Sequence, residues 1–214
     1  MRVFLFLFVA ILWGLPTDVS ATKPNIVFIL ADDLGIGDVH CYGGERCLIE
    51  TPDIDALASG GLRFTDAHVN ASVCSPTRRA LMTGRYNWRY GATVNSGPWG
   101  FVGPRPDTEK STLGKVLQRT GYRTGYVGKW HLGTAMTTFD GKTQGPTNVD
   151  FTKPLTYGPP QFGFDESFIL PGSLDMFPYV FARNNVWQGE VTAQKGWSAF
   201  NRVGPAEKNF QDHE

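Results

Sequence analysis

A continuous run of apolar and largely β-branched residues, I-V-F-I-L, follows Asn25 and ends at Ala31. A strand with one face in water alternates apolar and polar residues, so this uninterrupted run predicts a strand that is buried on both faces. Such strands are typical of parallel sheets covered by helices. Asp32 and Asp33 follow directly, and ligands in open α/β sheets gather beyond the carboxyl ends of strands. The segment therefore predicts an α/β fold with two carboxylates at a functional edge.

The remaining sequence continues this alternation of strands and helices. Glycine, proline and serine punctuate it at the expected ends. The predicted helices cover residues 52–59, 75–83 with Ser75 as N-cap, and 111–118 with Ser111 as N-cap, while the predicted strands cover 62–69, 122–127 and 164–170. A long loop is expected at 134–160, and no element is assigned after Pro171. The pattern predicts a mixed, mostly parallel sheet sandwiched by helices, incomplete at the C-terminus.

The first 21 residues have the features of a cleaved signal peptide. Arg2 supplies the positive charge, an apolar stretch runs to Trp13, and V-S-A ending at Ala21 offers small residues for cleavage. The stretch is short for a bilayer span, so a cleaved signal is favoured over a stable membrane anchor. The mature chain, residues 22–214, is therefore expected to be secreted or periplasmic.

The charge balance excludes some classes of partner. Twenty basic residues offset twenty acidic ones, so the net charge is zero and nucleic-acid binding is not predicted. Three cysteines occur: Cys41, Cys47 and Cys74. A Cys41–Cys47 disulfide would leave Cys74 as the odd cysteine, and two thiols at 41 and 47 fit the sequence equally well.

Two motifs carry most of the chemical information. The first, C-S-P-T-R-R-A-L-M-T-G-R, starts at Cys74 and places Arg78 one helical turn later, on the same face of the predicted helix. The second, G-Y-R-T-G-Y-V-G-K-W-H-L-G, starts at Gly121 and carries Lys129 and His131 past a strand end. If extended geometry persists there, these two side chains point to the same side. A lysine supplies a point cation for an anion, and a histidine can donate or accept a proton.

Both motifs resemble the signatures of the sulfatase family, which belongs to the alkaline phosphatase superfamily. The first matches C-x-P-x-R with a following Thr-Gly pair, and the second matches at every fixed position. The resemblance implies that a formylglycine-generating enzyme oxidises Cys74 to an aldehyde. In the implied reaction its hydrate, a gem-diol, attacks sulfur with one hydroxyl and displaces the alcohol of the ester. Deprotonation of the other hydroxyl then expels sulfate and restores the aldehyde. It further implies that Arg78 stabilises the formylglycine, Lys129 contacts it and the sulfate, and His131 holds its hydroxyl.

The resemblance also implies a metal and a further polar contact. Asp32 and Asp33, together with the modified Cys74, would hold calcium, with magnesium as the alternative, because these ions prefer oxygen ligands. Ser173 resembles a position where some family members place a side chain that contacts sulfate. The expected substrates are sulfate esters of small aryl compounds or carbohydrates.

Several family features are not found in this sequence. The second metal pair and a further catalytic lysine and histidine have no plausible equivalents, so residues 22–214 are expected to be the N-terminal part of a sulfatase catalytic domain, truncated and poorly active alone. Two alternatives stay open. One is a phosphonate or phosphodiester hydrolase of the same superfamily, and the other is an inactive, secreted anion-binding pseudoenzyme.

Overall fold

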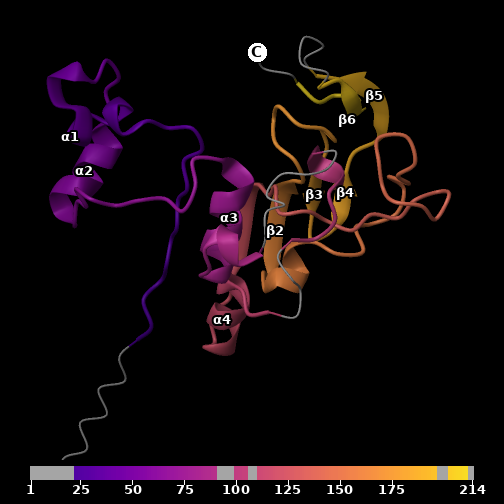
Figure 1. Ribbon diagram of the computed structural model, residues 1–214, viewed down its shortest axis with the longest axis horizontal. Coiled ribbons are helices and arrows are strands. Elements are labelled where there is room, and N and C mark those ends of the chain that lie inside the picture. Colours follow the sequence, from indigo (N-terminus) through magenta and orange to yellow (C-terminus); the bar gives the residue numbers. More distant parts are fainter. Residues whose placement is uncertain (1–21, 91–98, 106–109, 197–201, 212–214) are drawn as a thin grey trace, which may run out of the picture. The chain divides into compact units, whose positions relative to one another are not determined.

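The computed structural model describes residues 22–90, 99–105, 110–196 and 202–211 (Figure 1). The chain divides into two compact units, Met1–Leu62 and Arg63–Glu214, and each is described by itself. The expected signal peptide, residues 1–21, lies outside the described residues. Within the described part of the chain, no helix combines the length and apolarity needed to cross a bilayer.

The first unit is built on short helices that Asp55 holds together. Its elements are a 3-10 helix at Ile36–Asp38, α1 at His40–Gly43, a 3-10 helix at Gly44–Arg46 and α2 at Pro52–Gly60. The Asp55 carboxylate accepts a hydrogen bond from the Cys41 backbone N–H at 2.8 Å and one from the Thr51 hydroxyl at 3.2 Å. The helix predicted at 52–59 is confirmed, with proline at its start. Cys41 and Cys47 form no disulfide with each other.

The predicted strand at 25–31 is not formed. Residues 22–31 have no strand assignment, and Val27 and Ile29 are 84% and 81% exposed. An apolar run identifies residues that favour burial, but a strand also needs a neighbour whose backbone accepts and donates hydrogen bonds. Among the described residues, none forms a β-pair with this segment. The strand predicted at 62–69 is absent for the same reason, and Leu62 is 87% exposed.

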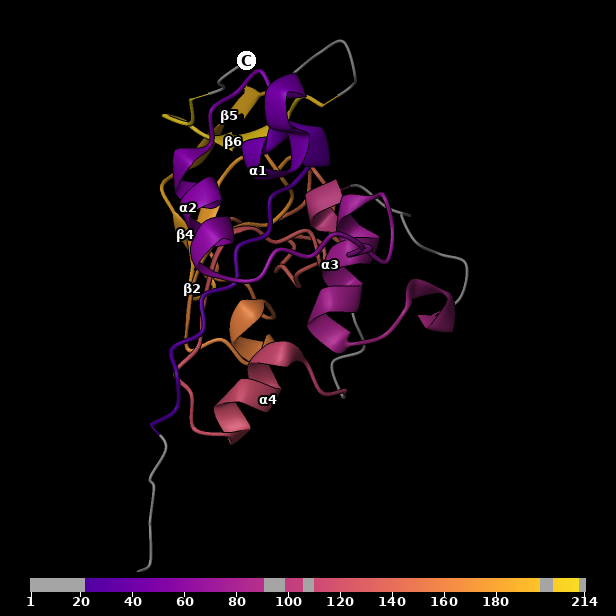
Figure 2. The same cartoon turned by 90° about the vertical axis from the view of Figure 1, so that its left-hand side faces the viewer.

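The second unit places two helices beside a sheet. α3 covers Cys74–Thr83 and α4 covers Leu113–Arg119, and the two helices are in contact (Figures 1 and 2). Gly84 ends α3 in the left-handed conformation and donates its N–H to the Ala80 carbonyl. Both predicted N-caps are wrong by one or two residues. The N-cap residue of α3 is Val73, whose side chain makes no capping hydrogen bond. The N-cap residue of α4 is Thr112, whose hydroxyl oxygen accepts from the Lys115 N–H at 3.3 Å.

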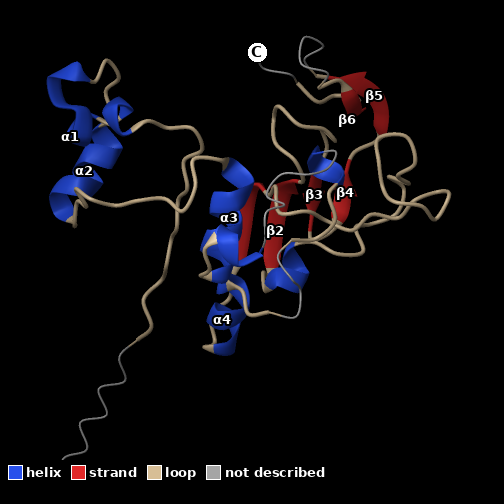
Figure 3. Ribbon diagram, viewed as in Figure 1, coloured by secondary structure: helices blue, strands red, loops and turns tan. Residues whose placement is uncertain are grey.

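Among the described residues, a four-stranded sheet has the order β1-β2-β3-β4 (Figure 3). β1 pairs parallel with β2, while β3 pairs antiparallel with β2 and with β4. The strands are β1 at Gly125–Lys129, β2 at Glu166–Leu170, β3 at Phe181–Arg183 and β4 at Val186–Gln188. A separate antiparallel pair joins β5 at Val191–Lys195 to β6 at Gly204–Glu207. The α/β class, a mixed sheet flanked by helices, is confirmed.

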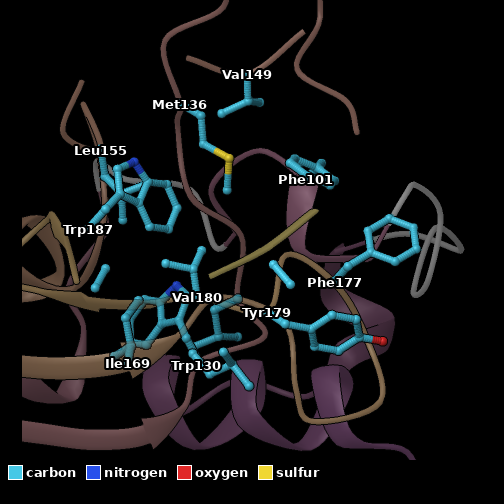
Figure 4. Close-up of a cluster of buried hydrophobic side chains, with 14 of the residues drawn as sticks. Phe101, Trp130, Met136, Val149, Leu155, Ile169, Phe177, Tyr179, Val180 and Trp187 are labelled. Carbon is cyan, nitrogen blue, oxygen red and sulfur yellow. The ribbon is translucent and has the colours of Figure 1, made fainter. Parts of the chain in front are cut away.

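The hydrophobic core of this unit includes the residues that follow β1, and these pack against the sheet and the neighbouring loops. Trp130 lies in the cluster of buried side chains in Figure 4 and is fully buried. It contacts the rings of Tyr126, Phe162 and Phe164 edge-on. Its indole N–H donates to the Gly133 carbonyl at 2.8 Å, so its polar group is satisfied. Burial of a side chain of this size contributes at least about 2–3 kcal/mol. Trp130 therefore stabilises the backbone between Lys129 and His131.

Candidate active site

Three of the predicted site residues lie at one edge of the sheet. Lys129 is the last residue of β1 and pairs with Leu170, the last residue of the parallel strand β2. The His131 backbone N–H donates to the Pro171 carbonyl at 3.0 Å, and Ser173 lies two residues further along. Because the carboxyl ends of parallel strands meet at one edge, β1 and β2 bring Lys129, His131 and Ser173 to the same edge.

Cys74 is the first residue of α3 and is half-buried. Because Val73 provides no side-chain cap, no side chain of the N-cap residue takes up the first N–H groups of this helix. No acidic residue lies in the first turn of α3 either. The positive end of the helix dipole favours anions at this position. A nucleophile at residue 74 would therefore lie at the end of the helix that favours a bound sulfate group.

Arg78 ties α3 to the end of β1. It is 7% exposed, and its Nη1 donates to the Lys129 carbonyl oxygen at 2.6 Å and to the Tyr126 hydroxyl at 3.1 Å. The Tyr126 hydroxyl donates to the same Lys129 carbonyl at 2.6 Å. A buried guanidinium is costly unless its protons find acceptors, and these bonds offset part of that cost. The structure thus brings the helix that carries Cys74 to the strand end that carries Lys129.

The backbone beyond Lys129 departs from extended geometry. β1 ends at Lys129, and His131 has φ +50°, in the left-handed region that residues other than glycine rarely adopt. The condition for alternation from Lys129 to His131, a backbone that stays extended, is therefore not met. Such a conformation costs of the order of 1–3 kcal/mol and is typical of functional sites. The Trp130 core contacts and the His131–Pro171 hydrogen bond hold this conformation in place.

Gly133 lets a second loop approach the same turn. It has φ +78°, and an added Cβ would lie 1.9 Å from the Gly103 carbonyl oxygen. The Thr134 N–H donates to the Val102 carbonyl at 3.0 Å, and the Arg105 N–H donates to the Leu132 carbonyl at 2.6 Å. The final glycine of the second motif is therefore required both for its backbone conformation and for this close contact.

Ser173 is buried, and its hydroxyl bonds to a carboxylate. Its Oγ donates to the Asp175 carboxylate, which also forms an ion pair with Arg202. Burial raises the pKa of the Asp175 carboxyl, but the Ser173 hydrogen bond and the charges of Arg202 and Lys129 outweigh it, and the net pKa is lowered. A hydroxyl has one proton to donate. In this arrangement Ser173 presents lone pairs, and not a proton, to any further partner.

Asp32 and Asp33 belong to the first unit, whereas Cys74, Arg78, Lys129, His131 and Ser173 belong to the second. Both aspartates are exposed, and Asp33 has φ +64°. In the described ranges, no three side chains of His, Cys, Asp or Glu gather as a group that could hold a metal ion. The two carboxylates are of the donor type that calcium or magnesium prefers, as part of a set of six or more oxygens. The metal assignment of Asp32, Asp33 and Cys74 stays a prediction.

The chain matches a model of a known protein family. The family model described as Sulfatase matches residues 24–180, which is more than half of the chain. The chain belongs to the sulfatase family. Both motifs, with Cys74, Arg78, Lys129 and His131, lie within the matched residues.

Curated relatives in the sulfatase family include bacterial and human proteins. The chain is 40% identical over 167 residues to an N-acetylgalactosamine-6-O-sulfatase of Bacteroides thetaiotaomicron, covering 77% of this chain and 30% of the relative. It is 42% identical over 158 residues to human arylsulfatase A, covering 74% of this chain and 27% of that protein. The chain thus spans less than a third of the length of these sulfatases.

Solved structures give the same result for the fold. A chain solved in work on glycosaminoglycan metabolism by Bacteroides thetaiotaomicron superimposes with a TM-score of 0.67 at 39% identity, covering 78% of this chain and 32% of that chain. The crystal structure of Ps i-CgsB superimposes with a TM-score of 0.61 at 31% identity, covering 79% and 38% respectively. The alkaline phosphatase-like sulfatase fold is therefore shown.

Two polar groups that reach this edge of the sheet, the Tyr126 hydroxyl and the Asp175 carboxylate, were not predicted from the sequence. Tyr126 lies at a variable position of the second sulfatase motif, so the motif gives no reason to select it. Asp175 lies two residues after Ser173, and a carboxylate at this spacing can accept from a preceding serine hydroxyl. That spacing is the signal that could have identified Asp175, whereas no local signal identifies Tyr126.

Proposed function

We propose that this chain is the nucleophile-bearing part of a sulfuric ester hydrolase that uses formylglycine derived from Cys74. The observation that carries the proposal is the pair of hydrogen bonds from Arg78 to Lys129 and Tyr126. These bonds hold the helix that starts at Cys74 against the strand end that carries Lys129. When present, the aldehyde hydrate supplies the attacking hydroxyl and a second hydroxyl for release of sulfate.

Each remaining residue has a distinct proposed role around that group. Lys129 supplies a positive charge for a sulfate oxygen, and His131 holds or moves a proton at the hydroxyl of residue 74. Arg78 is proposed to contribute its positive charge to the anionic side of the site, while its Nη1 donates to the Lys129 carbonyl and the Tyr126 hydroxyl. Ser173 is proposed to support this edge through Asp175, and not as a proton donor to sulfate.

Asp32 and Asp33 are proposed to contribute carboxylate oxygens to a calcium site, with magnesium as the alternative. A divalent cation supplies charge stabilisation for sulfate oxygens and for an ionised hydroxyl. The substrates are proposed to be sulfate esters of aryl compounds or carbohydrates, since the relatives include both arylsulfatase A and an N-acetylgalactosamine-6-O-sulfatase. A formylglycine-generating enzyme is the proposed processing partner, and a secreted or periplasmic location follows from the N-terminal 21 residues.

Mass spectrometry of the peptide that contains Cys74, combined with turnover assays, tests this proposal. The protein is co-expressed with a formylglycine-generating enzyme, and 4-nitrophenyl sulfate is compared with a phosphonate ester and a phosphodiester of 4-nitrophenol. We expect the aldehyde mass at residue 74, slow turnover with preference for the sulfate ester, and loss of that turnover in Cys74→Ala. Aldehyde formation without hydrolysis would favour the anion-binding pseudoenzyme. Preference for phosphorus esters would favour a phosphonate or phosphodiester hydrolase instead.

A further inference from the structure

The hydroxyl of Tyr126 completes a closed set of hydrogen bonds between α3 and β1. It accepts from Arg78 Nη1 at 3.1 Å and donates to the Lys129 carbonyl at 2.6 Å, and Nη1 also donates to that carbonyl at 2.6 Å. One Nη carries two protons, a phenol carries one, and a carbonyl oxygen has two lone pairs. The three hydrogen bonds therefore use both Nη1 protons, the phenol proton and both lone pairs of the carbonyl oxygen.

The aromatic ring of Tyr126 fixes where this hydroxyl lies. The ring contacts Trp130 edge-on at a centroid distance of 5.0 Å and Phe164 at 5.3 Å. Trp130 is fully buried and Phe164 is 7% exposed, so the ring cannot move without disturbing the core. The hydroxyl is therefore held at a preset position, and it selects one orientation of the Arg78 guanidinium.

We propose that Tyr126 is a positioning residue for the reaction, which sets the Arg78 guanidinium and thereby the distance between the Cys74 end of α3 and Lys129. This inference rests on the proposed function, because Tyr126 acts through residues assigned to that chemistry. Without the hydroxyl, Nη1 loses one of these two hydrogen bonds, and the Lys129 carbonyl loses one of its two donors. Small displacements of a nucleophile from the reacting geometry reduce the rate more than they reduce substrate binding.

Tyr126→Phe tests this role, because it keeps the ring and removes the hydroxyl. Tyr179→Phe is the matched control. Tyr179 is 1% exposed, it lies in the same core, and its hydroxyl donates to the Arg202 carbonyl at 2.7 Å. The full chain, with residue 74 converted to the aldehyde, is assayed with 4-nitrophenyl sulfate and with inorganic sulfate as inhibitor. We expect kcat to fall about tenfold in Tyr126→Phe, with KM and the inhibition constant of sulfate changed less than about twofold. Tyr179→Phe should keep the wild-type kcat.

A double-mutant cycle measures the energetic coupling between Tyr126 and Arg78 by unfolding, which requires no enzymatic activity. Urea unfolding is compared for wild type, Tyr126→Phe, Arg78→Lys and the double variant. We expect the unfolding constant of the double variant to differ at least about fivefold from the product of the single effects, because the two groups share hydrogen bonds. Additive effects, or equal kcat for Tyr126→Phe and Tyr179→Phe, would overturn the inference while the proposed function stands. A wild-type chain that carries the aldehyde but hydrolyses no sulfate ester would overturn both.

Discussion

Arg78 donates a 2.6 Å hydrogen bond to the backbone carbonyl of Lys129, a residue 51 positions later in the chain. The two residues come from separate sequence motifs, one at the start of a helix and one at the end of a strand. The hydrogen bond between them brings the two motifs together in one site. Arg78 therefore has a structural role in addition to any contact with the substrate.

Replacement of Arg78 by lysine should damage this site severely. Lysine keeps the charge, but its nitrogen lies one atom closer to the backbone than Nη1 of arginine, and it lacks the rigid plane that fixes the directions of the guanidinium donors. We expect kcat for 4-nitrophenyl sulfate to fall about 100-fold or more, with a loss of about 2–3 kcal/mol in the free energy of unfolding. Arg79→Lys is the matched control, because Arg79 stacks its guanidinium 3.7 Å from the centroid of the Tyr90 ring and keeps its cation in the variant. Wild-type kcat in Arg78→Lys would contradict the assignment.

Gly133→Ala should destabilise the protein more than a similar change elsewhere. The new Cβ would lie 1.9 Å from the Gly103 carbonyl oxygen, and φ of +78° adds backbone strain. We expect a loss of about 3 kcal/mol or more in urea unfolding. Gly141→Ala is the control, because Gly141 also has positive φ, +67°, but its Cβ would meet nothing within 4 Å. That variant should lose about 1–2 kcal/mol. Equal losses in the two variants would show that close approach at Gly133 does not matter.

Stability should decrease in acid because of Asp165, whose carboxylate holds the start of β1. The Thr124 backbone N–H donates to it at 2.7 Å, and the Thr124 hydroxyl and Gln118 also donate to it. These hydrogen bonds, the backbone one first, lower the pKa of the Asp165 carboxyl. A lowered pKa in the folded state means that the stabilisation is complete above the ordinary Asp pKa, about 3.9, and is lost as the pH falls below it.

Thermal unfolding of wild type and Asp165→Asn across pH 2.5–7, ~0.5 units apart, measures this effect. The wild type should be the more stable protein at pH 5–7, and the difference should narrow steadily below about pH 4. A difference that stays constant down to the most acidic sample would show that the carboxylate form is not what stabilises β1.

Loss of Asp32 or Asp33 should weaken calcium binding. Each carboxylate is expected to supply oxygen to the ion, so Asp32→Ala and Asp33→Ala should each raise the calcium dissociation constant at least about tenfold in titration calorimetry. Asp38→Ala is the control, because Asp38 is an exposed acid in the same segment. Chelation should abolish sulfate-ester turnover, and added calcium should restore it. Equal calcium affinity in all three variants would contradict the proposed ligands.

Single residues in the sequence correctly predicted the start of α2 and the end of α3. Proline at position 52 starts α2, and Gly84 ends α3 because it adopts a left-handed conformation without strain. Another such signal was missed. Asn184 and Asn185, with φ of +47° and +71°, form the two-residue turn between β3 and β4, and asparagine tolerates this conformation better than most residues.

The family, the candidate residues of the site and the helix that carries Arg78 could be predicted from the sequence, because they depend on fixed spacings and local backbone preferences. The partners of these side chains could not be predicted, because they come together only through tertiary contacts. The bonds of Arg78 to Tyr126 and Lys129, and of Ser173 to Asp175, form at the shared edge of β1 and β2. The apolar run at 25–31 shows the same limit, since apolar character is a property of residues whereas a strand requires a neighbour.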